Sequence, residues 1–104
     1  MEIQQINDAF RTTLSGGRVM LTAGVASLST ERQAAILAAV RNFSAFSKDD
    51  DPYGEHDFGR VEQGGEAFFW KIDYYDRNME FASPDPLDTG RTLRVLTIMR
   101  VDEY

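Results

Sequence analysis

The sequence predicts an α+β fold, with two N-terminal helices packed on a mainly antiparallel sheet of four to five strands. Apolar residues recur with helical spacing in the first half, and with strand alternation beyond about residue 57. Glycine, proline and aspartate separate these segments as turn signals. With 104 residues, 42% of them hydrophobic and 12% aromatic, the chain fits one domain over 1–104.

The first predicted helix runs from about residue 2 to 13. Its spacing creates one apolar face, made of Ile3, Ile6, Phe10 and Leu14. The residues Ser15-Gly16-Gly17 end this helix, and the β-prone run 18–22 predicts a short strand.

The second predicted helix runs from about residue 30 to 44. Thr30 and Gln33 have the spacing of a capping box, in which each side chain bonds the other residue's backbone N–H. The buried face of this helix would consist of Ile36, Leu37, Val40 and Phe43.

The second half of the chain has the alternation of an antiparallel sheet. Strands are predicted at 58–62 and 66–75, joined by a hairpin turn at Gln63-Gly64-Gly65. One face of the long strand is expected in the core, namely Phe68, Trp70, Ile72 and Tyr74. A further extended segment is expected at 79–82, and a proline-containing loop at 83–90. The last strand, about 91–101, is apolar on both faces and is predicted to be central.

Composition excludes several function classes. The net charge is −6, and residues 49–104 carry fourteen acidic and only six basic side chains, so we expect no direct nucleic-acid binding. Cysteine is absent, which excludes disulfides, thiolate catalysis and zinc–cysteine sites. No apolar run approaches the roughly 20 residues of a membrane span, and no basic-then-apolar leader opens the chain. These features predict a cytoplasmic protein that does not bind membranes.

The candidate site is the acidic loop, which we define as residues 49–57. It contains five acids and the only histidine of the chain. Consecutive aspartates disfavour helix and strand, and Pro52 with Gly54 favours a turn, so we expect an exposed connection. We predict that the acidic loop binds a basic protein surface through Asp49, Asp50, Asp51, Tyr53, Glu55, His56 and Asp57.

Two other functions of the acidic loop stay open from the residues alone. Asp49, Asp51 and Gly54 match part of a calcium loop, but Tyr53 and Arg60 occupy positions that need oxygen ligands. A nonstandard cation site, or a hydrolase in which Glu55 or Asp57 orients His56, is the alternative. The structural alternative is that His56 ties the loop to the first hairpin. We predict no transition-metal site, because the chain has one His and no Cys. We also predict no cofactor.

A second constellation lies on the other face of the long predicted strand, where aromatic residues alternate with charged ones. Aromatic side chains beside a base can stack nucleobases. The acidity of this half of the chain opposes that function, and we expect packing and cross-strand pairing instead. The residues concerned are Phe69, Lys71, Asp73 and Tyr75.

Three strings and the C-terminal pair carry a resemblance: residues 51–59 (DPYGEHDFG), 70–76 (WKIDYYD), 96–99 (LTIM) and Glu103-Tyr104. They resemble a family of small bacterial proteins known as a domain of unknown function, number 3768. The resemblance implies a bacterial cytoplasmic protein that is often encoded on plasmids and other mobile elements. It implies no catalytic residue. An accessory or anti-defence role, with a nucleic-acid-handling or defence protein as the partner, is the expectation that this setting suggests.

Overall fold

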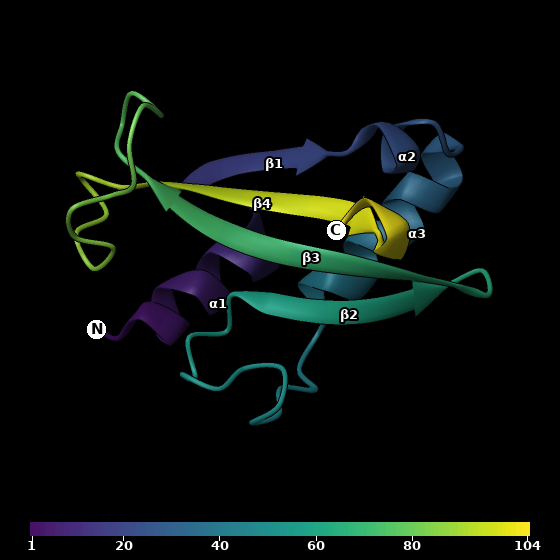
Figure 1. The fold of residues 1–104 in the computed structure, drawn as a ribbon, viewed down its shortest axis with the longest axis horizontal. Helices are drawn as coiled ribbons and strands as arrows, with labels where there is room; N and C mark the ends of the chain where they lie inside the picture. The colour runs from purple at the N-terminus through teal and green to yellow at the C-terminus, as the bar shows by residue number, and fades with distance from the viewer.

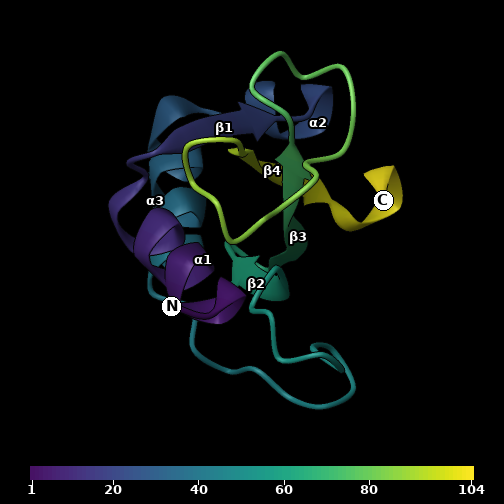
Figure 2. The same ribbon diagram turned by 90° about the vertical axis from the view of Figure 1, so that its left-hand side faces the viewer.

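Two helices cover one face of a four-stranded sheet in the computed structural model (Figure 1), which describes residues 1–104. Figure 2 shows α1 and α3 on one side of the sheet and the C-terminal turn on the other. The helices are α1 (Ile3–Thr13), α2 (Ala23–Ala26) and α3 (Thr30–Arg41), followed at the C-terminus by the 3-10 turn η1 (Val101–Glu103). The strands are β1 (Gly17–Leu21), β2 (Phe58–Gln63), β3 (Glu66–Tyr75) and β4 (Leu93–Arg100).

The sheet is mixed, with the strand order β1-β4-β3-β2. Strands β2, β3 and β4 pair antiparallel, but β1 pairs parallel with β4, from Gly17 opposite Arg94 to Leu21 opposite Ile98. The prediction of a mainly antiparallel sheet is therefore corrected at its β1 edge. The prediction that the last strand is central is confirmed, because β4 has neighbours on both sides and buries Val95 as well as Leu96.

The two long helices form where the sequence predicts them, with one difference in capping. Ser29, not Thr30, is the N-cap of α3, and its hydroxyl accepts a hydrogen bond from the Arg32 backbone N–H. With Ser29 as the N-cap, Gln33 lies one residue beyond the position that a capping box requires. Its amide nitrogen donates instead to the carbonyls of Ala26 and Leu28. Helix α3 ends at Arg41, before the predicted residue 44.

The single-turn helix α2 was not predicted, and the C-terminus explains its position. The Glu103 carboxylate accepts hydrogen bonds from the Thr22 hydroxyl and the Gly24 backbone N–H at the start of α2. The hydrogen bond from Thr22, with those from the backbone of Arg100 and Gly24, lowers the pKa of Glu103. Tyr104 packs edge-on against Phe69 on the sheet face opposite α1 and α3. The last two residues therefore connect α2 to the sheet.

The β2–β3 hairpin is confirmed at the predicted place. Its two loop residues, Gly64 and Gly65, have φ angles of 62° and 80°, which is the left-handed geometry of a type I′ turn. The predicted extended segment at 79–82 forms only an isolated bridge between Tyr75 and Ala82. Met79 has a φ of 58°, which no strand tolerates, so the sheet has four strands and not five.

The core lies between the sheet and the two long helices, and Trp70 is at its centre. Trp70 has no exposed surface, and Phe43 and Phe46 meet its ring edge-on at 5.5 and 6.1 Å between centroids. The predicted core face of β3 is confirmed, with Phe68, Trp70 and Ile72 buried and Tyr74 packed against the same cluster.

None of the helices has both the length and the hydrophobicity that a membrane-spanning helix needs.

Candidate functional site

The acidic loop joins α3 to β2 and is held at several points. The Asp51 backbone N–H donates to the Ser47 carbonyl at 2.7 Å, and Gly54 N–H donates to the Asp51 carbonyl at 3.1 Å. Gly54 has a φ of 66°, which fits the predicted turn. The Asp51 carboxylate is buried and accepts the backbone N–H of His56 at 3.2 Å. The expectation that all three aspartates are exposed is therefore wrong for Asp51.

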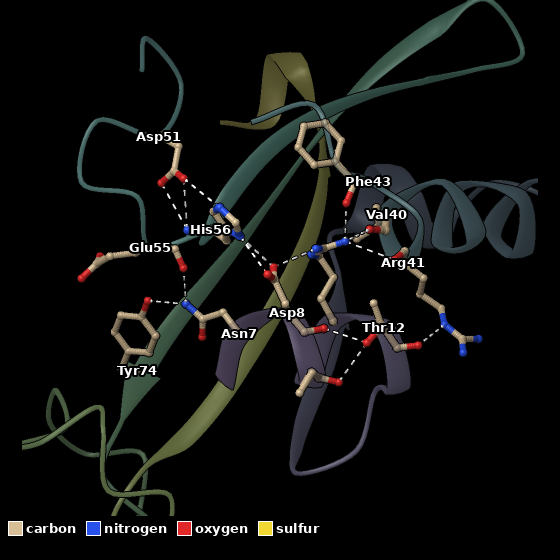
Figure 3. A network of polar contacts seen from close by, with 12 residues as sticks. Asn7, Asp8, Thr12, Val40, Arg41, Phe43, Asp51, Glu55, His56 and Tyr74 are labelled. Atoms are coloured by element: carbon tan, nitrogen blue, oxygen red, sulfur yellow. Dashed lines mark hydrogen bonds and ion pairs between the residues drawn. The ribbon is translucent and has the colours of Figure 1, made fainter. Parts of the chain in front are cut away.

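His56 fastens the acidic loop to α1. Its Nδ1 lies 2.9 Å from Asp8 Oδ2, and its Nε2 lies 3.7 Å from Asp51 Oδ2. The imidazole stacks on the Phe46 ring, with centroids 3.8 Å apart and planes 1° from parallel. Figure 3 shows the ring between the two carboxylates. His56 therefore has a structural role, as one interpretation of the sequence expects. Its hydrogen bond goes to Asp8 of α1, however, and not to the first hairpin.

Arg11 extends this contact to the end of α3. Its guanidinium donates to Asp8 at 3.0 Å, to the Val40 carbonyl in the last turn of α3 at 2.9 Å and to the Phe43 carbonyl just beyond the helix at 2.9 Å. A cation at a helix C-terminus also interacts favourably with the helix dipole. Arg11 is 3% exposed, and its guanidinium lies 5.3 Å from the centroid of the Trp70 ring. One buried side chain thus joins α1, α3 and the core.

Asn7 makes the corresponding contacts toward the sheet. Its amide nitrogen donates to the Glu55 carbonyl at 2.9 Å and to the Tyr74 hydroxyl at 2.8 Å. Its amide oxygen accepts from Arg94 Nε at 2.7 Å. Burial raises the pKa of Tyr74 to about 12, although the Asn7 hydrogen bond opposes the rise, so the phenol is neutral at pH 7. Figure 3 shows the Glu55 carboxylate pointing away from this network while its carbonyl enters it.

The remaining carboxylates of the acidic loop have no basic partner inside the chain. Asp49 and Asp50 are exposed, and Glu55 and Asp57 are partly exposed. The arginine and lysine ion pairs of the structure go to other acids, namely Asp8, Glu62, Glu66 and Asp73. The arginines and lysines therefore form ion pairs elsewhere in the chain, and none of them neutralises a carboxylate of the acidic loop.

The carboxyl groups of Glu55 and Asp57 both have raised pKa values, and burial is the main cause for each. Burial raises the pKa of Glu55, and the neighbouring Asp57 raises it further. Burial also raises the pKa of Asp57, and the charges of Asp51 and Asp73 add to the rise. The hydrogen bonds from its own backbone N–H and with the Glu55 side chain oppose it. The ionised forms of these two carboxylates therefore destabilise the folded chain.

The two raised pKa values predict a pH dependence of stability. Because both carboxyl groups hold their protons more tightly in the folded chain, their contribution to stability is present below the ordinary values of 4.5 and 3.8 and is lost as pH rises above them. The stability of the variant Glu55→Gln/Asp57→Asn, relative to that of the parent, should therefore rise between about pH 4 and about pH 7. Urea unfolding across this range measures the difference. A variant less stable than the parent at neutral pH would show that the carboxylates stabilise the fold.

The geometry does not favour the hydrolase alternative. The groups that face the two ring nitrogens of His56 are Asp8 and Asp51, and neither Glu55 nor Asp57 orients the ring. No group of three or more His, Cys, Asp or Glu side chains is arranged to hold a metal ion. The partial calcium-loop match of Asp49 and Asp51 therefore has no matching arrangement of ligands.

The second constellation, on β3, is occupied by contacts within the sheet. Lys71 and Asp73 form an ion pair at 3.0 Å. Phe69 packs against Phe58 and Tyr104, with ring centroids 5.2 and 5.3 Å away. These contacts match the expected pairing, and they leave no row of free aromatic faces for nucleobases.

Sequence reasoning missed the residues of α1 that position the acidic loop. Asp8 and Arg11 are separated from the loop by about forty residues. The sequence places them only on the polar face of an amphipathic helix. The one available signal is the three-residue spacing between them, which permits an ion pair but does not indicate His56.

One comparison with known proteins gave a match. The model of a family described as "Protein of unknown function (DUF3768)" matches residues 21–103, which is most of the chain. No curated protein and no solved structure matches the chain. The matched range includes the acidic loop, β2, β3 and β4, whereas α1 lies before it.

Proposed function

The chain belongs to the family described as "Protein of unknown function (DUF3768)", and for this member we propose a non-enzymatic function as a protein-binding module. The acidic loop meets a basic surface on a partner protein. The proposed contact groups are Asp49, Asp50, Tyr53, Glu55 and Asp57. Asp51 and His56 hold the loop in shape instead of contacting the partner, because both are engaged inside the chain.

The observation that carries this proposal is the uncompensated charge of the acidic loop. The chain has nine arginines, yet none of them, and neither lysine, forms an ion pair with an acid of residues 49–57. Glu55 and Asp57 even destabilise the fold in their ionised forms. Groups that cost stability are typical of sites kept for function. A partner's arginine or lysine beside them would remove this cost.

The anchoring of the loop also supports binding. The contact of His56 with Asp8 and that of Asn7 with the Glu55 carbonyl fix the backbone beside the carboxylates of Glu55 and Asp57. The hydrogen bond from the Asp51 N–H to the Ser47 carbonyl closes a turn around Asp49 and Asp50. A partner then meets a surface that is already ordered, so less conformational entropy is lost on association.

Tyr53 adds an aromatic group to the charged surface. Tyr53 is 87% exposed, and only Pro52 separates it from the aspartate run. Tyrosine is enriched among the residues that dominate protein interfaces, where an acidic rim sets orientation and an aromatic ring supplies buried area. This combination favours a protein partner over a diffuse counter-ion atmosphere.

The partner class follows from the charge. Closely spaced carboxylates on a fixed loop are suited to a basic groove that otherwise binds phosphates. We propose a nucleic-acid-handling or defence protein as the partner. The chain would then be encoded by a mobile element and act as an accessory protein or as an inhibitor of the defence protein, a setting that the resemblance implies.

Capture from a bacterial lysate tests the proposal. The immobilised chain should retain a basic protein at about 0.1 M salt and release it at about 1 M, because the Debye length falls from about 10 Å to about 3 Å. The variant Asp49→Asn/Asp50→Asn should retain much less of it. The control Glu80→Gln/Asp102→Asn removes the same charge from exposed positions outside the loop and should retain as much as the parent. Equal retention by all three proteins would exclude the acidic loop as the binding surface.

A further inference from the structure

A cavity of about 630 Å³ opens between α1, the turn before β1 and the loop that precedes β4. It is lined by two arginines, Arg77 and Arg94, and by four hydroxyl side chains, those of Thr13, Ser15, Thr89 and Thr92. No carboxylate lines it, although the chain carries seventeen acidic residues. Its volume lies within the range of about 300–1,000 Å³ typical of small-molecule sites.

Arg94 is the unusual group of this cavity, because it is a buried cation without an anionic partner. It is 2% exposed, and its Nε and Nη2 donate to Asn7 Oδ1 and the Pro86 carbonyl, each at 2.7 Å. Its third nitrogen, Nη1, has no protein acceptor, and no carboxylate forms an ion pair with it. Tyr74, 5.0 Å from the guanidinium, is a neutral phenol at pH 7 and supplies no counter-charge. A buried charge is costly unless it is paired.

Arg77 places a second guanidinium at the rim of the same cavity. Its side chain is exposed, and Nη1 reaches the Thr92 carbonyl at the long distance of 3.4 Å. It also forms no ion pair with a carboxylate. Guanidinium groups bind carboxylates and phosphates through paired N–H donors, and neighbouring hydroxyls add further donors.

The other wall of the cavity is apolar and belongs to α1. Ile6, Ala9 and Phe10 line it, so a ligand would meet cationic donors on one side and hydrocarbon on the other. We propose that this cavity binds a small organic anion, whose carboxylate or phosphate group contacts Arg94 and Arg77 and whose apolar part packs against Ile6, Ala9 and Phe10. This site is separate from the acidic loop and does not depend on the proposed partner.

Four probes test the proposal by titration calorimetry. Phenyl phosphate and benzoate combine an anion with a ring, inorganic phosphate has only the anion, and benzyl alcohol has only the ring. At least one of the first two should bind the full chain more tightly than inorganic phosphate, and benzyl alcohol should bind most weakly. The tighter of the two ring anions identifies the preferred head group.

Three variants at exposed positions locate the binding site without disturbing the core. Arg77→Gln removes a charged donor and should weaken binding about tenfold or more. Ala9→Phe fills the apolar side of the cavity and should also weaken it. Arg91→Gln removes one positive charge from the same loop outside the cavity and should bind as the parent does. Absence of binding by every probe would overturn the proposal, and so would a loss in Arg77→Gln without a loss in Ala9→Phe.

Discussion

Replacing Arg11 with Ala is expected to lower the free energy of unfolding by about 3 kcal/mol or more. The substitution removes the donors to Asp8, to the Val40 carbonyl at the end of α3 and to the Phe43 carbonyl after it. It also leaves a hole beside the Trp70 ring, against which the guanidinium packs. The groups left behind are buried or partly buried, so they lose hydrogen bonds that water replaces poorly.

The control for this substitution is Arg18→Ala. Arg18 is exposed on β1 and forms no ion pair, so this variant removes the same charge at a cost within about 0.5 kcal/mol. Urea unfolding of both variants gives the comparison. If the two variants lost equal stability, the contacts of Arg11 with Asp8 and α3 would not be stabilising the fold.

The variant Gly59→Ala is expected to lower the free energy of unfolding toward the upper end of the 1–3 kcal/mol typical of overpacked cores. Gly59 lies opposite Trp70 in the β2–β3 ladder, and an added Cβ would lie 2.6 Å from Cε2 and 2.8 Å from Cζ2 of the indole. Phe43 and Phe46 also contact the Trp70 ring edge-on, and Trp70 has no exposed surface, so the indole cannot move without displacing its neighbours.

A double-mutant cycle tests this cause. Trp70→Phe removes the part of the indole that Gly59 approaches, so Gly59→Ala should cost less in that background than in the parent. Gly90→Ala, in an exposed loop where the added Cβ meets only the Asp88 side chain at 3.3 Å, should change stability little. An equal cost of Gly59→Ala in both backgrounds would show that the indole is not the cause.

The sequence predicted those elements that depend on neighbouring residues alone. The β2–β3 hairpin was predictable because Gly64 and Gly65 supply the positive φ angles of its turn between two alternating segments. The apolar face of α1 was predictable from its spacing. By contrast, the parallel pairing of β1 depends on β4, which follows it by about seventy residues. No periodicity in β1 encodes the direction of that neighbour.

The candidate site shows the same limit of local reasoning. The acidic loop was identified from its composition, and Asp49 and Asp50 are exposed as expected. Asp51 belongs to the same run of aspartates, and the sequence does not distinguish it from Asp49 and Asp50. It is nevertheless buried, because its carboxylate accepts the His56 backbone N–H. The role of His56 depends on Asp8, which only the packing of α1 brings near. The anion cavity was not predicted either, because Arg77 and Arg94 become neighbours only through the fold.

In the proposed function, Glu55 and Asp57 serve a partner at the expense of the stability of the fold. For the variant Glu55→Gln/Asp57→Asn, stability at neutral pH and the association rate with the captured partner are measured on the same preparation. We predict that the variant unfolds at a higher urea concentration than the parent and associates more slowly. A variant that is less stable, or that associates at the parent's rate at about 0.1 M salt, would contradict the claim.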